Sequence, residues 1–143
     1  MVHMLVEDVM RKQVITAKPS ISVSEAAKIM NEFNIGCLVI VDNGKLIGII
    51  TDSDMKSVVA RGLDAKSTKV SEVMTKRVLT IEHHKPVDYA IEIMAARSIK
   101  RLPVTKEGKL VGLVSVSDII VVVPSMIHTV SNMLSFDPRR FAG

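Results

Sequence analysis

The sequence predicts a mixed α+β (α/β-like) fold of two tandem βαββα units. Two observations carry this prediction: the chain repeats itself, and each copy shows the same succession of strand and helix patterns. The second half matches the first at a constant offset of 64 residues without a gap. Pairing residues 9–56 with 73–120 gives 17 identities in 48 positions, whereas ordinary residue usage gives about 3 by chance. Self-similarity at a fixed period indicates a repeated structural unit.

Each copy opens with a short strand and an amphipathic helix. Residues 14–16 and 78–80 are short β-branched or aliphatic runs that predict strands. In the first copy, Ser22 and Glu25 form a capping box ahead of apolar residues at helical spacing. In the second copy, Pro86 is expected at the first helical position.

The second half of each copy predicts a hairpin and a further helix. Residues 37–41 and 46–51 are continuous apolar runs, as expected for strands buried on both faces. Residues 42–45 between them read as a hairpin turn. A second helix is expected from about Ser53 to Gly62.

The whole chain, 1–143, is expected to form one module. Repeat 1 covers residues 5–62, a linker covers 63–69, repeat 2 covers 70–125, and a C-terminal helix or tail covers 126–143. We expect the repeats to pack about a pseudo-twofold axis, because each alone leaves an apolar face uncovered. The tail carries an apolar stripe that can form a homodimer interface or fold back on its own core; its members are Met126, Ile127, Val130, Met133 and Leu134.

Composition argues against several classes of function. The net charge of +4 suits an anionic small molecule and does not require nucleic acid. Four scattered aromatic residues provide no platform for stacking bases, so nucleic-acid binding is not expected. Cys37 is the only cysteine, which favours a reducing compartment. No signal peptide and no membrane span are recognisable, so a cytoplasmic location is expected.

No catalytic constellation is apparent, and the chain is not expected to be an enzyme. It has no phosphate-binding loop of the Gly-Lys-Ser/Thr type, no nucleophile elbow, and no nucleophile paired with a base. His83 and His84 lack a Glu or Cys partner at ligand spacing, so a solvated loop is expected there and no metal site. No cofactor is expected to be required.

The end of the third strand carries the most specific motif in both copies. Residues 48–54 read GIITDSD and residues 112–118 read GLVSVSD. Together with VMT at 73–75 and IKRLPV at 99–104, these segments resemble tandem cystathionine β-synthase (CBS) domains, a pair known as a Bateman module. The resemblance covers about residues 5–125.

The resemblance implies a regulatory role. Such pairs have two clefts between the repeats, bind AMP, ADP, ATP or S-adenosylmethionine, and commonly dimerise. They regulate inosine monophosphate dehydrogenase, AMP-activated kinase and channels. The 143 residues carry no such catalytic domain, so the chain resembles a stand-alone pair that acts on an unknown protein.

The resemblance also implies which residues bind the ligand. They are, in repeat 1, Thr16, Ile35, Gly36, Cys37, Thr51 and Asp54, and in repeat 2, Thr80, Ile99, Lys100, Arg101, Pro103, Ser115 and Asp118. Asp54 and Asp118 are suited to accept hydrogen bonds from ribose hydroxyls. Alternatively, each aspartate only caps the following helix, a task that Ser53 and Ser117 can also perform.

The other candidates have equally simple alternatives. Thr51 and Ser115 suit ribose or phosphate, or are exposed strand ends. Thr16 and Thr80 lie beside the ligand, or reflect only strand propensity. Ile35 and Ile99 flank an adenine slot, where Gly36 permits close backbone approach, or they belong to the core.

The two copies differ in charge near the expected ligand. Lys100 and Arg101 can hold a phosphate, or form a solvated basic pair. Asp52 adds an acid to the first copy, where a like charge disfavours phosphate. The site at Asp118 is therefore expected to prefer phosphorylated ligands. The resulting hypothesis is a homodimeric sensor of adenine nucleotides; the alternatives are a structural dimerisation module with vestigial clefts and an S-adenosylmethionine sensor.

Overall fold

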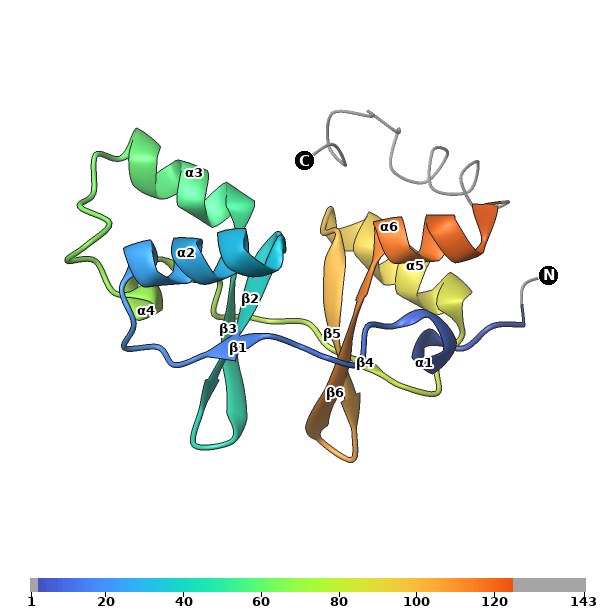
Figure 1. Cartoon of the computed structure of the whole chain (residues 1–143). Helices are drawn as coiled ribbons and strands as arrows, with labels where there is room; N and C mark the ends of the chain where they lie inside the picture. Colours follow the sequence, from blue (N-terminus) through green and yellow to red (C-terminus); the bar gives the residue numbers. More distant parts are fainter. Residues whose placement is uncertain (1–2, 125–143) are drawn as a thin grey trace. The chain divides into compact units, whose positions relative to one another are not determined.

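The computed structural model describes residues 3–124 (Figure 1). Two series of elements follow each other along the chain. The first comprises α1 (Val6–Val9), β1 (Thr16–Ala17), α2 (Val23–Phe33), β2 (Cys37–Asp42), β3 (Lys45–Thr51) and α3 (Asp52–Ala60). The second comprises α4 (Val70–Val73), β4 (Ile81–Glu82), α5 (Val87–Arg97), β5 (Arg101–Lys106), β6 (Lys109–Ser115) and α6 (Val116–Val122).

Each series contains one three-stranded sheet. The strand orders are β1-β2-β3 and β4-β5-β6; in both, the first pair is parallel and the second antiparallel. Both hairpins have a register shift at the same relative place, after Ile40 and after Val104. The predicted α+β fold and its βαββα order are therefore confirmed, and each series opens with an additional single-turn helix, α1 or α4.

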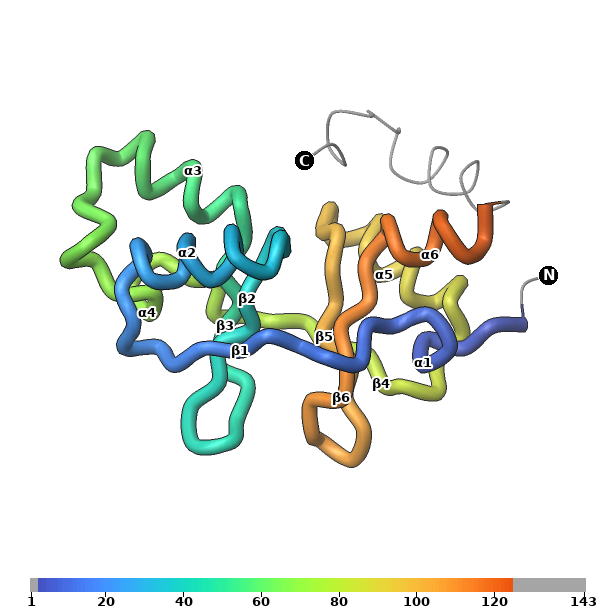
Figure 2. The backbone as a smooth tube through the Cα atoms, viewed as in Figure 1, coloured from blue at the N-terminus to red at the C-terminus, as the bar shows by residue number. Residues whose placement is uncertain are grey.

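The chain divides into two compact units whose boundaries differ from those of the sequence repeats. The repeat-1 unit is Ile15–Val78. The repeat-2 unit combines residues from Leu79 onward with the N-terminal segment, residues 3–14 of the described chain. Figure 2 shows this segment forming α1 and then running along β6.

Backbone hydrogen bonds hold the N-terminal segment on β6. The Arg11 amide donates to the Leu113 carbonyl at 2.8 Å, and the Leu113 amide donates to the Arg11 carbonyl at 2.9 Å. In the repeat-1 unit, Thr75 and Ile49 exchange the equivalent bonds at 2.9 and 3.0 Å. Each sheet is thus extended by the segment that opens the other repeat in sequence.

Each unit has its own core on the helix-covered face of its sheet. In the repeat-1 unit, α2 packs on β2 and β3, with Val70 of α4 completing the core; the buried members are Ala26, Met30, Leu38, Ile40, Ile50 and Val70. In the repeat-2 unit, α5 and α6 pack on β5 and β6 together with Val6 and Val9 of α1. Burial of these aliphatic side chains is the main source of stability.

The predicted strands at 14–16 and 78–80 are placed too early. Strand β1 begins at Thr16 and β4 begins only at Ile81. In repeat 1, the Val39 amide donates to the Ile15 carbonyl at 3.4 Å. Pro103 takes the place of Val39 in repeat 2 and has no N–H, so that contact is lost and the strand begins one position later.

Helix ends also refine the sequence prediction. Pro86 is the N-cap of α5 rather than its first helical residue. The left-handed residue that ends α2 is Asn34, with φ of 51°. The second helix of repeat 1 begins at Asp52 and ends at Ala60.

The apolar stripe at residues 126–134 lies outside the described residues. Within residues 3–124, no helix has the length and apolar character needed to cross a membrane.

Candidate functional site

In each unit the candidate residues gather where the hairpin leads into the following helix. Cys37 at the start of β2 pairs with Thr51 at the end of β3, and Arg101 pairs with Ser115 in the same way. The Asp52 amide donates to the Gly36 carbonyl at 3.1 Å, which fixes the loop before β2 against the start of α3. The Val116 amide makes the equivalent bond to the Lys100 carbonyl at 3.0 Å.

In repeat 1, Asp54 is held by a reciprocal capping box. The Asp54 amide donates to Thr51 Oγ1 at 3.4 Å, while Asp54 Oδ2 accepts from the Thr51 amide at 2.9 Å and from its hydroxyl at 3.2 Å. The half-buried carboxylate therefore has a defined orientation. Its second oxygen, Oδ1, has no hydrogen bond to any residue in the described range.

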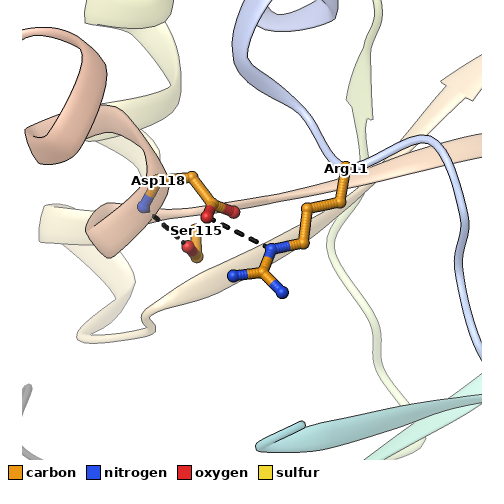
Figure 3. Close-up of polar contacts among 3 residues, drawn as sticks. All are labelled: Arg11, Ser115 and Asp118. Atoms are coloured by element: carbon orange, nitrogen blue, oxygen red, sulfur yellow. Dashed lines mark hydrogen bonds and ion pairs between the residues drawn. The ribbon is translucent and has the colours of Figure 1, made fainter. Parts of the chain in front are cut away.

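In repeat 2, Asp118 is held differently (Figure 3). Ser115 Oγ accepts from the Asp118 amide at 3.0 Å, so the N-cap is retained. The carboxylate turns to the N-terminal segment instead, where its Oδ1 accepts from Arg11 Nε at 3.2 Å. The Asp118 side chain is only 16% exposed, and no bond to its Oδ2 is found among residues 3–124.

Strand pairing places several candidates on one face of each sheet. Partners in a ladder point to the same face, as do residues two apart on a strand. Thr16 pairs with Val39, so its side chain shares a face with Cys37 and Thr51. This is the face opposite the helix-covered core, which contains Leu38, Ile40 and Ile50.

The same argument adds two residues that sequence reasoning missed. Arg11 pairs with Leu113, and Thr75 pairs with Ile49. Arg11 therefore shares a face with Arg101 and Ser115, and Thr75 shares one with Cys37 and Thr51. The available signal was the 64-residue offset, which aligns Arg11 with Thr75, but nothing local connects either residue to the opposite repeat.

Other candidates lie nearby with mixed roles. Ile35 and Ile99 are half-buried and pack against the cores of their units, consistent with the packing alternative. Pro103 and Cys37 are buried in their strands. Thr80 is exposed and lies outside β4, immediately before it.

Two expectations about these segments are wrong. Ser53 and Ser117 do not cap the helices; both are exposed in the first turn, and the N-caps are Thr51 and Ser115. His83 is not simply solvated, because its Nδ1 lies 2.7 Å from Glu7 Oε2 on α1. The described chain nevertheless contains no group of three or more His, Cys, Asp or Glu side chains that could hold a metal.

The chain matches known proteins along most of its length. The family model of the CBS domain matches twice, at residues 6–61 and 70–125. The CBS domain-containing protein YhcV of Bacillus subtilis is 36% identical over 117 residues, which is 81% of this chain and 83% of that protein. Inosine-5′-monophosphate dehydrogenase of Methanocaldococcus jannaschii is 37% identical over 116 residues; the match covers 80% of this chain but only 22% of the enzyme.

A solved structure agrees with both sequence and fold. The CBS domain pair of protein MJ0100, in complex with 5′-methylthioadenosine and S-adenosyl-L-methionine, has a TM-score of 0.78 and 37% identity. It covers 85% of this chain, which in turn covers 97% of that domain pair. With two family matches and two βαββα units, the chain belongs to the CBS domain family, whose paired domains are regulatory ligand-binding modules.

Proposed function

We propose that the chain is a regulatory module that binds an adenosyl ligand at Asp54 and Asp118 and passes this signal to a protein partner. The observation that supports it most is the state of the two carboxylates. In each, one oxygen is fixed by neighbouring groups and the other makes no hydrogen bond within residues 3–124. A preoriented acceptor suits the two adjacent hydroxyls of a ribose, because hydrogen bonds to a charged acceptor are strong.

Adenine nucleotides are the proposed ligands. The adenosyl part is supported by the complex of the MJ0100 domain pair with two adenosyl compounds. The phosphate part is supported by Arg101, which lies opposite Ser115 on the same face of the sheet. S-adenosylmethionine is the second candidate, favoured by its presence in that same solved complex.

The proposed action is regulatory and not catalytic. The enzyme among the relatives described above is a much longer protein, of which the matched region is a small part. A bound ligand changes a partner's activity only if it binds two states of the module with different affinity.

The proposed location is the cytoplasm. With a single cysteine and hence no internal disulfide, the chain fits this reducing compartment.

A thermal-melt panel tests the ligand. The panel uses AMP, ADP, ATP, NAD, S-adenosylmethionine and 5′-methylthioadenosine with the wild type, Asp54→Ala and Asp118→Ala. A ligand at one hundred times its Kd stabilises by about 2.7 kcal/mol, which for a chain of this size raises Tm by roughly 5–10 °C. We expect AMP, ADP or ATP to raise Tm, and the rise to shrink in at least one aspartate variant.

The control is Asp52→Ala, which removes an exposed carboxylate from the same first turn of α3 and should not reduce the rise in Tm, because a like charge disfavours phosphate binding. Each rise in Tm is measured against the same variant without ligand, because loss of the capping box in Asp54→Ala also lowers stability. A response to only S-adenosylmethionine or 5′-methylthioadenosine would replace nucleotides by the second candidate. No response to any compound would favour a structural dimerisation module.

The proposal includes a homodimer. Val121 and Val122 on α6 are 78% and 48% exposed, although both are aliphatic. Exposed apolar side chains on one helix suit an interface with a second copy. Light scattering should give the mass of a dimer at micromolar concentration, and Val121→Ser should weaken it; a monomeric wild type would contradict this part of the proposal.

A further inference from the structure

We propose that Arg11 makes the Asp118 site selective for ligands that carry a phosphate. This inference rests on the proposed adenosyl function and adds a specificity-determining residue to one of the two sites. It is carried by the ion pair between the N-terminal segment and the start of α6, in which Arg11 Nε donates to Asp118 Oδ1 at 3.2 Å.

The geometry leaves most of the guanidinium available. Only Nε contacts Asp118, and Figure 3 shows the two terminal nitrogens directed away from the carboxylate. Neither terminal nitrogen has a hydrogen bond to another residue of the described chain. The Arg11 side chain is 65% exposed, so a ligand in solution can reach it. A planar guanidinium with open donors matches two oxygens of a phosphate group.

The position of Arg11 is fixed although its side chain is exposed. Both backbone bonds to Leu113, at 2.8 and 2.9 Å, place it on the edge of β6 two residues before Ser115. Its side chain shares one face of the sheet with those of Arg101 and Ser115. Ser115 is on β6, which lies between the N-terminal segment and β5. A ligand whose ribose contacts Asp118 therefore lies beside two arginines.

The repeat-1 site provides the contrast. Thr75 stands at the place of Arg11 and has no charge, while Cys37 stands at the place of Arg101. The first turn of α3 carries two acids, Asp52 and Asp54. The repeat-1 site has no arginine at this place, and Asp54 bonds to Thr51 in a capping box, whereas Asp118 forms an ion pair. A phosphate thus meets positive charge at one site and negative charge at the other.

The test compares AMP with adenosine, two ligands that differ only in the phosphate. Isothermal titration calorimetry in an Asp54→Ala background isolates the repeat-2 site. Arg11→Thr, which copies the equivalent residue of the other unit, should weaken AMP binding about tenfold, the effect of one charged hydrogen bond. Adenosine binding should weaken by a smaller factor, because adenosine loses only the orientation of Asp118 and no phosphate contact. The reciprocal Thr75→Arg, in an Asp118→Ala background, should strengthen AMP binding at the repeat-1 site.

Two further variants separate this role from general effects. Lys12→Thr removes a neighbouring exposed charge from the same segment and should leave the AMP-to-adenosine ratio within about twofold of its starting value. Arg11→Gln keeps most of the side-chain stem and should reproduce the loss of AMP preference if Arg11→Thr disturbs folding.

The outcomes distinguish the inference from the proposed function. If both ligands bind and their ratio is independent of Arg11, the inference is wrong and the proposed function stands. An equal gain for both ligands in Arg11→Thr would show that Arg11 only obstructs Asp118, which also overturns the inference. If neither ligand binds the wild type, the proposal of adenine nucleotides as ligands is itself wrong.

Discussion

Gly48 and Gly112 occupy equivalent positions in β3 and β6, but different kinds of atoms lie against them. Flexible side-chain atoms face Gly48, whereas a backbone oxygen also faces Gly112. The three atoms nearest to a β-carbon at Gly48 would all belong to the Met74 side chain. A β-carbon at Gly112 would meet the Met10 side chain and also lie 2.9 Å from the Arg11 carbonyl oxygen. Because that carbonyl accepts from the Leu113 amide, moving it would weaken the pairing of the N-terminal segment with β6.

We therefore expect Gly112→Ala to destabilise more than Gly48→Ala. Overpacking against backbone typically costs about 1–3 kcal/mol, whereas the flexible Met74 side chain can turn away at a smaller cost. Urea denaturation of the two variants measures the difference. Equal losses of unfolding free energy would show that the N-terminal segment yields as readily as a methionine side chain.

The order of the elements follows from the sequence because local signals and the repeat agree. Ser22 caps α2 as expected, with the Glu25 amide donating to Ser22 Oγ at 3.0 Å, but the Glu25 carboxylate accepts from the Ser22 hydroxyl at 3.3 Å instead of completing a capping box. The continuous apolar runs at 37–41 and 46–51 became β2 and β3, and the repeat places β5 and β6 at the equivalent positions. The strand starts were harder to predict, because β1 and β4 depend on pairing with β2 and β5 and not on their own residues.

The candidate site was predictable only in part for the same reason. The aspartates and their neighbouring hydroxyls lie within a few residues of each other, so the motif alone places them together. Arg11 and Asp118 are 107 positions apart, and their contact depends on the N-terminal segment pairing with β6. The repeat offset aligns Arg11 with Thr75 but does not show to which sheet either segment adds.

At the scale of the whole molecule, a sequence repeat and a compact unit are different sets of residues. Val6 belongs to repeat 1 in the sequence, yet it is fully buried in the core of the repeat-2 unit. Val70 precedes the strands of repeat 2, yet it is fully buried in the core of the repeat-1 unit. Each unit therefore depends on a helix of one turn that is supplied from outside its own repeat.

This arrangement predicts that α1 stabilises the strands farther along the chain. Val6→Ala removes two buried methyl groups, which should destabilise the repeat-2 unit by about 2 kcal/mol. Native-state hydrogen exchange should then show faster exchange in β5 and β6, with β2 and β3 little changed. Val70→Ala is the matched control and should give the reverse pattern. If Val6→Ala instead loosens β2 and β3, the N-terminal segment belongs with its own repeat, and the contact between Arg11 and Asp118 loses its structural basis.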